Sequence, residues 1–312
     1  MILAVFTIFC ASCSMNDRAD EKKVIKIGYL PITHAAPLFI DAYNDKTRNY
    51  EVELVRFSSW PDLMDALNAG RIDGASVLIQ LAMKAKEKGI DLKAVALGHQ
   101  DGNVIISSKE IESVTDIEGT TFAIPHTYST HHLLLNEMLE RAEMMYEDVE
   151  MVEMPPAEMP AALAEDRISG YVVAEPFGAF ALHLDIGKVL AFSDDVWPHS
   201  YCCVLVFRND FIERNEEIAY DFMKHYVDAG KQADEKDAEV YTALQQFMNV
   251  DDDTLDISLE WISFEPLRIE KDEYEKVRDR VLQINLMEEP PSYEQFVNNS
   301  LIDRANKNDR NE

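Results

Sequence analysis

A ten-residue pattern occurs twice in this chain, and the second copy lies 96 positions after the first. The copies are ALNAGRIDGA (66–75) and ALAEDRISGY (162–171), and both read Ala-Leu, three residues, Arg-Ile, one residue, Gly. Each copy ends a helical segment that opens with Pro, and each leads into a short apolar segment typical of a strand, GASVL or GYVVA. A repeated helix-to-strand unit predicts two α/β lobes of similar local plan.

Apolar, β-branched segments alternate with amphipathic segments along the rest of the chain. We predict strands at 24–30, 51–57, 73–78, 92–98, 121–125, 149–153, 170–174, 188–192 and 201–207. Helices are predicted at 36–46, 61–69, 79–88, 129–142, 157–165, 177–184, 211–232, 234–248 and 271–286. The segment PSYEQF (291–296) and the tail NKNDRNE (306–312) are expected to be surface or disordered segments.

The lobes are not separated by a Gly/Ser-rich linker, so the chain is expected to cross between them twice. The crossings are predicted near 104–108 and 198–202, which gives a hinged pair of lobes with a cleft between them. The expected domains are a leader and tether at 1–23, a discontinuous lobe 1 at 24–105 plus 202–312, and lobe 2 at 106–201.

The charge of the chain excludes several classes of partner. The 58 acidic and 29 basic residues give a formal net charge of −29, which argues against nucleic acid and against docking on anionic lipid. No apolar run approaches the roughly 18 residues of a membrane-spanning helix. Catalytic signatures are also absent from the sequence: we find no GxSxG, Walker loop, HExxH, or GxGxxG after a strand.

The first residues, MILAVFTIFCAS, are uncharged, and Cys13 follows them, before the polar run SMNDRADEKK. This arrangement is similar to a bacterial lipoprotein signal with CASC as its lipobox. It implies cleavage before Cys13 and lipidation of that residue, which would anchor the protein to a membrane. An ordinary secretory leader, or a start codon elsewhere, is the alternative interpretation.

Cys202 and Cys203 are adjacent in sequence. In a strand their side chains would point to opposite faces, and neighbouring cysteines form a disulfide only with strain. With no CxxC motif and no Cys/His zinc spacing, we expect small strand residues and no disulfide scaffold.

We expect a ligand cleft at the residues that follow the predicted strands, because open α/β sheets bind ligands beyond the carboxyl ends of their strands. Four of the eight histidines occupy such positions. A single histidine there is more typical of a structural residue, so it is their convergence that indicates a site. The candidate cleft residues are Thr33, His34, Ala35, Gln80, His99, His126, Thr127, Glu175 and His199.

Hydroxyl side chains gather in HTYSTHHLLL (126–135), at the start of a predicted helix. Thr127, Ser129 and Thr130 there fit either an anion site at a helix N-terminus or plain helix capping. The adjacent His131 and His132 diverge by about 100° around the helix, so at most one of them faces the cleft.

Two further candidates also allow two interpretations each. Trp60 fits a pocket wall or a hydrophobic staple at the start of its helix. Glu175 fits a group that orients a histidine, ligates a metal or receives a ligand amine, and it equally fits a cap of the helix after Pro176.

Five segments together resemble the solute-binding proteins of ABC importers for nitrate, sulfonate, taurine and bicarbonate. The resemblance covers roughly residues 24–270 and is carried by IGYLPITHAAPLF, SWPDLMDALNAGRIDGA, LGHQDGNVIISS, MPPAEMPAALAEDRISGYVVAEPFGAFA and WPHSYCCVLV. It implies a type II periplasmic-binding fold with two lobes, a double crossover and hinge closure on a solute. It also implies that the ligand faces His34, Gln80, His126, Thr127, Glu175 and His199.

The resemblance implies an extracytoplasmic, lipid-anchored, monomeric receptor that needs no cofactor and delivers a small oxyanion or sulfonate-like solute to a permease and its ATPase. The sites of the family for nitrate and bicarbonate use a Lys, and no Lys stands at a predicted strand end here. A divalent metal such as zinc, or a metal–anion pair, is therefore an alternative solute, held by His34, His126, His199 and Glu175.

A different solute and a different class of function also fit the sequence. An aromatic heterocycle such as a pyrimidine precursor would stack on Trp60. An enzyme is the different class, because the same fold serves thiamine-pyrimidine synthases and menaquinone-pathway enzymes. Those enzymes are usually cytoplasmic, whereas this chain opens with an apolar leader.

Overall fold

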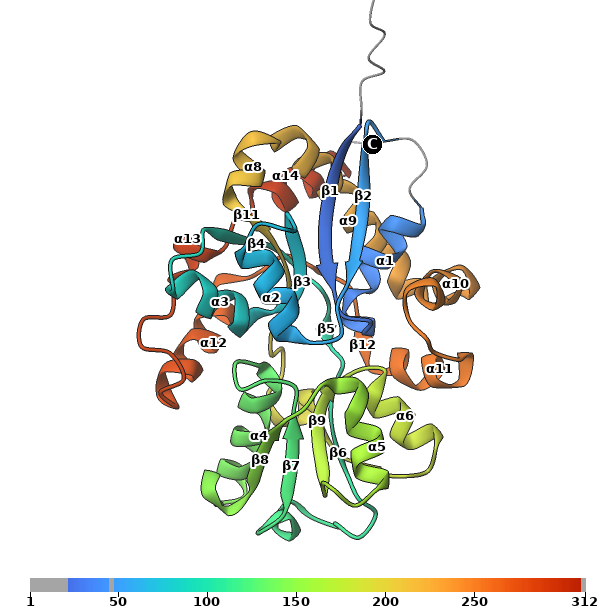
Figure 1. Cartoon of the computed structure of the whole chain (residues 1–312), viewed down its shortest axis with the longest axis vertical. Coiled ribbons are helices and arrows are strands. Elements are labelled where there is room, and N and C mark those ends of the chain that lie inside the picture. Colours follow the sequence, from blue (N-terminus) through green and yellow to red (C-terminus); the bar gives the residue numbers. More distant parts are fainter. Residues whose placement is uncertain (1–21, 45–47, 310–312) are drawn as a thin grey trace, which may run out of the picture.

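The computed structural model describes residues 22–44 and 48–309, so Cys13 and the rest of the leader lie outside the described residues. Two five-stranded sheets stand one above the other (Figure 1), and we call the bodies built on them lobe 1 and lobe 2. In sheet order, lobe 1 contains β2 (Tyr50–Arg56), β1 (Lys23–Tyr29), β3 (Gly74–Leu78), β11 (Cys203–Arg208) and β4 (Leu92–Leu97). Lobe 2 contains β10 (Lys188–Phe192), β6 (Asn103–Ser107), β9 (Gly170–Ala174), β7 (Thr121–Ile124) and β8 (Glu150–Glu153).

The two sheets share one strand arrangement. In lobe 1, β2, β1 and β3 run parallel, and β11 runs antiparallel between β3 and β4. In lobe 2, β8, β7 and β9 run parallel, and β6 runs antiparallel between β9 and β10. The repeat found in the sequence occupies equivalent places, because 66–75 leads into β3 and 162–171 leads into β9. The predicted two-lobe α/β fold is confirmed.

Each antiparallel strand begins directly after a crossing from the other lobe. The return crossing takes residues 197–202, close to the prediction, but the first takes 98–102, earlier than the expected 104–108. The stretch NVIIS (103–107) is β6, fully buried and paired on both sides, because a short apolar run fits a central strand better than a crossing. The expected domain boundary at 105/106 therefore falls inside a strand. Within the first crossing, β5 (Gln100–Asp101) pairs with β12 (Ile262–Ser263).

Helices cover both sheets, and most lie where the sequence predicts them. Those of residues 33–183 are η1 (Thr33–Ala35), α1 (Ala36–Tyr43), α2 (Trp60–Asn68), α3 (Ile79–Glu87), η2 (Val114–Ile117), α4 (Thr130–Arg141), η3 (Tyr146–Asp148), η4 (Pro156–Glu158), α5 (Met159–Ala164) and α6 (Phe177–His183). The others are α7 (Ser193–Val196), α8 (Asn209–Arg214), α9 (Glu216–Glu235), α10 (Ala238–Phe247), α11 (Asp252–Glu260), α12 (Lys271–Gln283), α13 (Tyr293–Phe296) and α14 (Ser300–Asp309). PSYEQF contains the short helix α13, in which Glu294 and Gln295 are exposed as expected of a surface segment, whereas Phe296 is fully buried.

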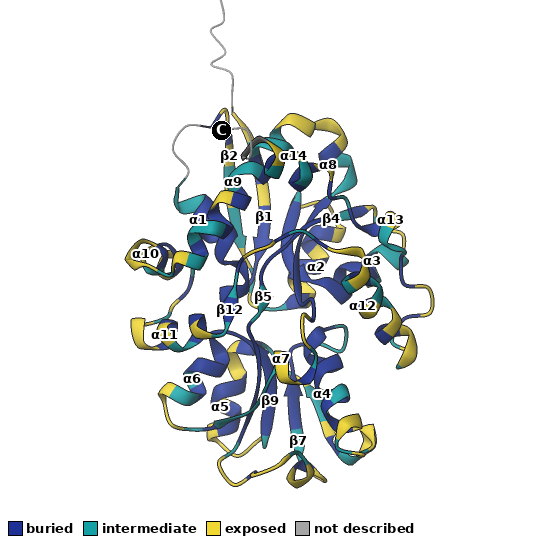
Figure 2. Ribbon diagram, turned by 180° about the vertical axis from the view of Figure 1, so that it is seen from behind, coloured by how far each residue is buried: buried dark blue, intermediate teal, exposed yellow. Residues whose placement is uncertain are grey.

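Residues at the helix starts explain several of these boundaries. Ser59 caps α2, where its hydroxyl accepts a hydrogen bond from the backbone N–H of Asp62, and Pro61 occupies the first turn. Ser129 caps α4 in the same way through the N–H of His132. The buried residues lie along the sheets and in stretches of the helices packed on them, as the dark blue segments of Figure 2 show.

The lobes touch through hydrogen bonds from several elements. The backbone N–H and the hydroxyl of Thr33 in lobe 1 both donate to the carbonyl of Glu175 in lobe 2, at 2.9 and 3.1 Å. Arg280 on α12 donates to Asn136 and pairs with Glu140, both on α4. The structure therefore shows the two lobes in direct contact with each other.

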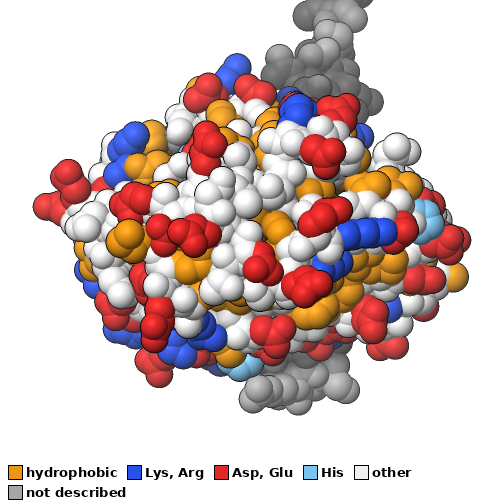
Figure 3. All heavy atoms as spheres, turned by 90° about the horizontal axis from the view of Figure 1, so that it is seen from below, with side chains coloured by type: hydrophobic (Ala, Val, Ile, Leu, Met, Phe, Trp, Pro, Cys, Tyr) orange, Lys and Arg blue, Asp and Glu red, His pale blue; other side chains and the backbone are white. Residues whose placement is uncertain are grey.

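Acidic side chains are spread over the face of lobe 2 that Figure 3 presents, with Lys and Arg in small groups among them. Within residues 22–44 and 48–309, no helix has both the length and the apolar character needed to cross a bilayer.

Candidate functional site

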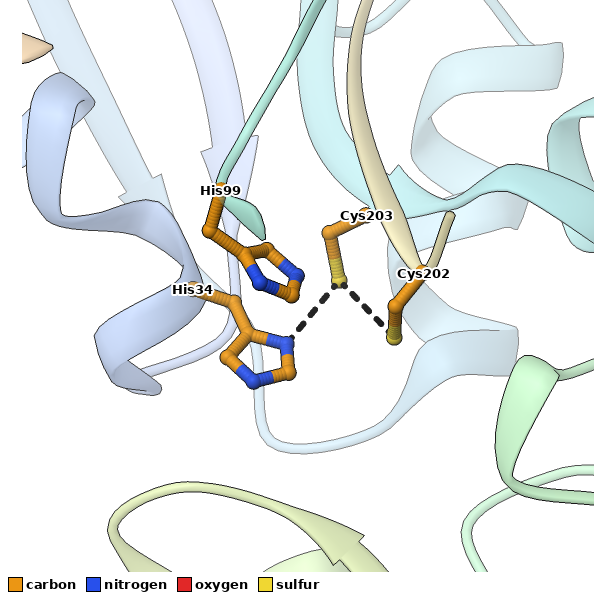
Figure 4. A group of neighbouring side chains, drawn as sticks. All are labelled: His34, His99, Cys202 and Cys203. Carbon is orange, nitrogen blue, oxygen red and sulfur yellow. Dashed lines mark hydrogen bonds between the residues drawn. The ribbon is translucent and has the colours of Figure 1, made fainter. Parts of the chain in front are cut away.

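Four buried side chains converge at the edge of the lobe 1 sheet that faces lobe 2 (Figure 4). They are His34, His99, Cys202 and Cys203, and each offers one nitrogen or sulfur atom within 4.8 Å of the others. We call this group the His/Cys cluster. It is the one group of three or more His, Cys, Asp or Glu in the described part of the chain with metal-ligand spacing.

Strand direction explains why residues so far apart in sequence meet. β1, β3 and β4 all end at this edge, so η1 with His34 follows β1 there, and His99 follows β4. β11 runs the opposite way and so begins at the same edge, where Cys203 pairs with Leu78, the last residue of β3. Cys202 lies just before the strand. The fold thus brings three separate chain segments to one point.

Hydrogen bonding fixes which nitrogen of His34 is free. Its Nε2 lies 2.9 Å from the carbonyl oxygen of Gly102, and a carbonyl can only accept, so Nε2 carries the proton and donates. In the neutral ring the lone pair is then on Nδ1, which faces the Sγ of Cys203 at 3.6 Å. The ring of His99 stacks on that of His34, with 3.6 Å between centroids. A histidine held in this way is oriented as metal-ligating histidines usually are.

The distances within the cluster match those of a zinc site. A tetrahedral zinc with Zn–S bonds of about 2.3 Å and Zn–N bonds of about 2.0–2.1 Å places two sulfurs about 3.8 Å apart and a sulfur and a nitrogen about 3.6 Å apart. The two thiol sulfurs are 3.8 Å apart, and Cys203 Sγ lies 3.6 Å from His34 Nδ1. Thiolate and imidazole donors also favour zinc over magnesium, calcium or manganese, which prefer oxygen.

Protonation in the cluster also suits a metal. Burial lowers the pKa of His99 to about 4, with a smaller contribution from His34, so its ring is neutral at neutral pH. Burial raises the pKa of the Cys203 thiol well above its usual range. Burial also raises the pKa of the Cys202 thiol, but the hydrogen bond with Cys203 and the nearby imidazoles, led by His131, lower it by more. The pKa of Cys202 therefore lies well below its usual range. Of the two thiols, Cys202 is therefore the one that loses its proton more readily.

Gly98 permits the close approach of η1 to the end of β4. A Cβ at this position would lie 2.6 Å from the backbone carbonyl oxygen of His34, too close for any side chain. We expect Gly98→Ala to lower the free energy of unfolding by about 1–3 kcal/mol, as overpacking in a core does. Urea unfolding monitored by circular dichroism measures this, and a change below about 0.5 kcal/mol would contradict the packing argument.

The hydroxyls expected to hold an anion already have partners inside the protein. Both the N–H and the hydroxyl of Thr127 donate to the carboxylate of Glu153. The Ser129 hydroxyl donates to the carbonyl of His126 while it caps α4. The Thr130 hydroxyl donates to the carbonyl of Tyr201 and accepts from the amide of Gln80, which links the two lobes. Of the two interpretations, helix capping is therefore the one that fits Ser129.

The remaining sequence candidates lie in different surroundings. His126 is half-buried beside Glu153, and its Nδ1 accepts from the N–H of Tyr128. His199 is exposed and has a left-handed backbone, with φ of 60°. Trp60 is buried in the core of lobe 1 rather than at an exposed wall. Ala35 is buried in η1, next to the cluster residue His34.

Glu175 serves as a buried connection between lobes. Its Oε2 accepts from the N–H of Ala179 at 2.9 Å, and its Oε1 accepts from the indole N–H of Trp261 at 3.2 Å. Burial raises the pKa of this carboxyl to about 8. The helix-capping interpretation of Glu175 agrees with the first of these bonds.

The His/Cys cluster shares only His34 with the metal set expected from the sequence, since His126, His199 and Glu175 lie elsewhere. The two cysteines also differ from expectation: their thiols do not point to opposite faces of a strand, because Cys202 precedes β11 and its sulfur contacts that of Cys203. The sequence did contain a usable signal. A strand that returns from the other lobe must begin at the interface between lobes, so its first residues belong with the strand-end residues.

The chain matches the NMT1-like family over residues 18–245. A solved ligand-binding component of an ABC-type import system from Staphylococcus aureus, with zinc bound, is 43% identical and has a TM-score of 0.86. The match covers 91% of this chain and 99% of that one. The periplasmic nitrate-binding protein NrtA from Synechocystis is 18% identical with a TM-score of 0.79, over 92% of this chain and 89% of that one, which shows the common fold.

Among curated proteins, the nitrate import ATP-binding protein NrtC of Synechocystis sp. is 24% identical over 247 residues, which make up 72% of this chain. The chain spans only 33–37% of the length of the curated relatives it matches first. The family match takes in well over half of the chain, and this protein therefore belongs to the NMT1-like family.

Proposed function

We propose that this protein is the extracytoplasmic solute-binding component of an ABC importer and that its solute is a divalent cation of the zinc type. This chain shares its fold with the solved import component from Staphylococcus aureus, at 43% identity and a TM-score of 0.86, and that structure has zinc bound. The His/Cys cluster would hold the cation at the face of lobe 1 that contacts lobe 2.

One observation carries the choice of a cation over an anion. The hydroxyls and amide at the lobe interface, those of Thr127, Ser129, Thr130 and Gln80, are joined to one another or to protein carbonyls and carboxylates. By contrast, both ring nitrogens of His99 are buried and make no hydrogen bond of normal geometry. The neutral ring of His99 has one N–H and one lone pair, and that lone pair joins the two thiols and the Nδ1 of His34 as atoms that can bind a cation. An anion would instead need several hydrogen-bond donors.

The charge of the chain supports the same choice. A net charge of −29 favours the approach of a cation and opposes that of nitrate, bicarbonate or a sulfonate. The Cys202 thiol, whose pKa lies below its usual range, would bind Zn²⁺ as a thiolate and so balance part of the charge of the cation in this buried site.

The remaining expectations form part of the proposal. Lipidation of Cys13 would keep the protein at the outer face of the membrane, beside a permease and its ATPase, and it would act as a monomer and without chemistry on its solute. The lobes would keep the expected order, 24–105 plus 202–312 and 106–201, with the first boundary moved to the crossing at 98–102 so that β6 stays whole in lobe 2. Thr33, Ala35, Gln80, His126 and His199 would then shape or border the closed site instead of contacting the cation.

Zinc binding to the metal-free full chain tests the proposal. We expect one zinc per chain by elemental analysis and a higher melting temperature, since zinc at about 100 times its Kd stabilises the folded state by about 2.7 kcal/mol. His99→Ala should lose both. His225→Ala, which changes a half-buried histidine on α9 outside the cluster, should keep both. A stabilisation by nitrate, bicarbonate or taurine with none by zinc would overturn the cation assignment and leave the receptor role.

A further inference from the structure

His131 is a fully buried histidine of lobe 2 that has no hydrogen-bond partner. It is the second residue of α4, its exposed fraction is 0%, and neither ring nitrogen bonds to any protein group. A buried polar group left without a partner costs about 1–3 kcal/mol. A natural core retains such a group when something outside the polypeptide satisfies it, as a bound ion does.

Contacts at the start of α4 bring His131 to the His/Cys cluster. The neighbouring Thr130 donates its hydroxyl to the carbonyl of Tyr201, and Tyr201 directly precedes Cys202. His131 interacts electrostatically with Cys202, His34 and His99, although its ring nitrogens are not among the atoms of the cluster that lie within 4.8 Å of one another. A neutral imidazole at this position would offer one lone pair to a cation.

The adjacent His132 is placed differently. Its Nδ1 lies 2.8 Å from the carbonyl of Thr127, its backbone N–H donates to the cap residue Ser129, and its ring meets that of Tyr146. The two histidines project about 100° apart from the helix, so only one of them can face lobe 1. Their local surroundings show that it is His131.

We propose that His131 is a metal ligand which lobe 2 supplies to the His/Cys cluster of lobe 1. The cation is then bound by both lobes at once, and a bond to His131 forms only when α4 is docked against lobe 1. This inference rests on the proposed cation-binding function and adds to it the residue through which occupancy of the site is coupled to the contact between lobes.

His131→Leu tests this proposal, and His132→Leu is the matched control. Leucine removes an unpaired polar group, so metal-free His131→Leu should melt at or above the temperature of the wild type, which shows that the variant folds. Zinc should bind His131→Leu at least about 10- to 100-fold more weakly than the wild type, because loss of even an outer-shell partner costs that much affinity. Small-angle scattering should show a smaller radius of gyration on zinc binding for the wild type and for His132→Leu, but not for His131→Leu.

Cobalt gives a second measurement, independent of affinity. In His131→Leu loaded with Co²⁺, the thiolate-to-metal charge-transfer absorption should remain, while the ligand-field bands should change because one nitrogen donor is lost. Wild-type affinity, compaction and cobalt spectrum in His131→Leu would overturn the role of His131 and leave the proposed function standing. Absence of zinc and cobalt binding to the wild type would overturn the cation site itself, and this inference with it.

Discussion

Cys202→Ser is expected to weaken zinc binding by at least about 100-fold, beyond the effect of losing an outer-shell partner. A serine hydroxyl is a hard donor that stays protonated near neutral pH, whereas the hydrogen bond with Cys203 acts against burial and the pKa of the Cys202 thiol lies well below its usual range. The change in volume is small, so the fold should persist.

Thermal unfolding with and without zinc measures this effect. Zinc should raise the melting temperature of the wild type and leave that of Cys202→Ser unchanged at the same concentration. Val204→Ala, two residues further along the chain in β11, is the control: it shortens a buried side chain without removing a donor atom, so it should lower the melting temperature and keep the zinc-dependent rise. An undiminished rise in Cys202→Ser would exclude this thiol from the site.

Glu175→Gln should change how stability depends on pH. Burial raises the pKa of Glu175 in the folded state to about 8, whereas the ordinary value is 4.5. Between these values the folded state binds more protons than the unfolded state, so this residue makes the protein less stable as pH rises from 4.5 to 8. At about 1.4 kcal/mol for each pH unit, the loss approaches 5 kcal/mol as an upper limit. The neutral glutamine removes this dependence.

Urea unfolding at several pH values from 5 to 9 tests the sign. The wild type should lose stability over this range and Glu175→Gln should lose much less of it. Glu153→Gln provides a contrast, because hydrogen bonds from Thr127 outweigh partial burial and lower the pKa of Glu153, so its stabilising effect is present above the unfolded value and is lost on acidification. Parallel profiles for the wild type and Glu175→Gln would contradict the buried ionisation of this carboxyl.

The architecture could be predicted from the sequence because it rests on local patterns. The repeated helix-to-strand unit marks β3 and β9, which hold the same place in their sheets, and apolar runs of four to seven residues mark most of the remaining strands. The error at the first crossing has a local cause as well. NVIIS is as apolar as a strand, but its five residues stand directly after the polar stretch HQDG, which marks the true crossing.

The site was only partly predictable, because its geometry depends on strand direction. His34 and His99 follow strands that end at the interface, so the rule of strand ends finds them. The same rule overlooks Cys202 and Cys203, which stand at the beginning of a strand that runs the other way. It also includes His126 and His199, whose neighbours in the chain direct them to Glu153 or to solvent. Only the paired geometry of β11 separates these cases.

The position of β11 between β3 and β4 sets an order of events as the chain folds. Lobe 1 contains the first strand of the chain, yet the middle of its sheet stays open until residues 203–208, which follow the whole of lobe 2 in the sequence, pair with β3 and β4. Cys203 begins that strand and Cys202 directly precedes it, so His34 and His99 have no complete set of partners before it pairs. The candidate site therefore comes into existence only when the sheet of lobe 1 is closed, and a cation held by these four side chains could bind only after that step.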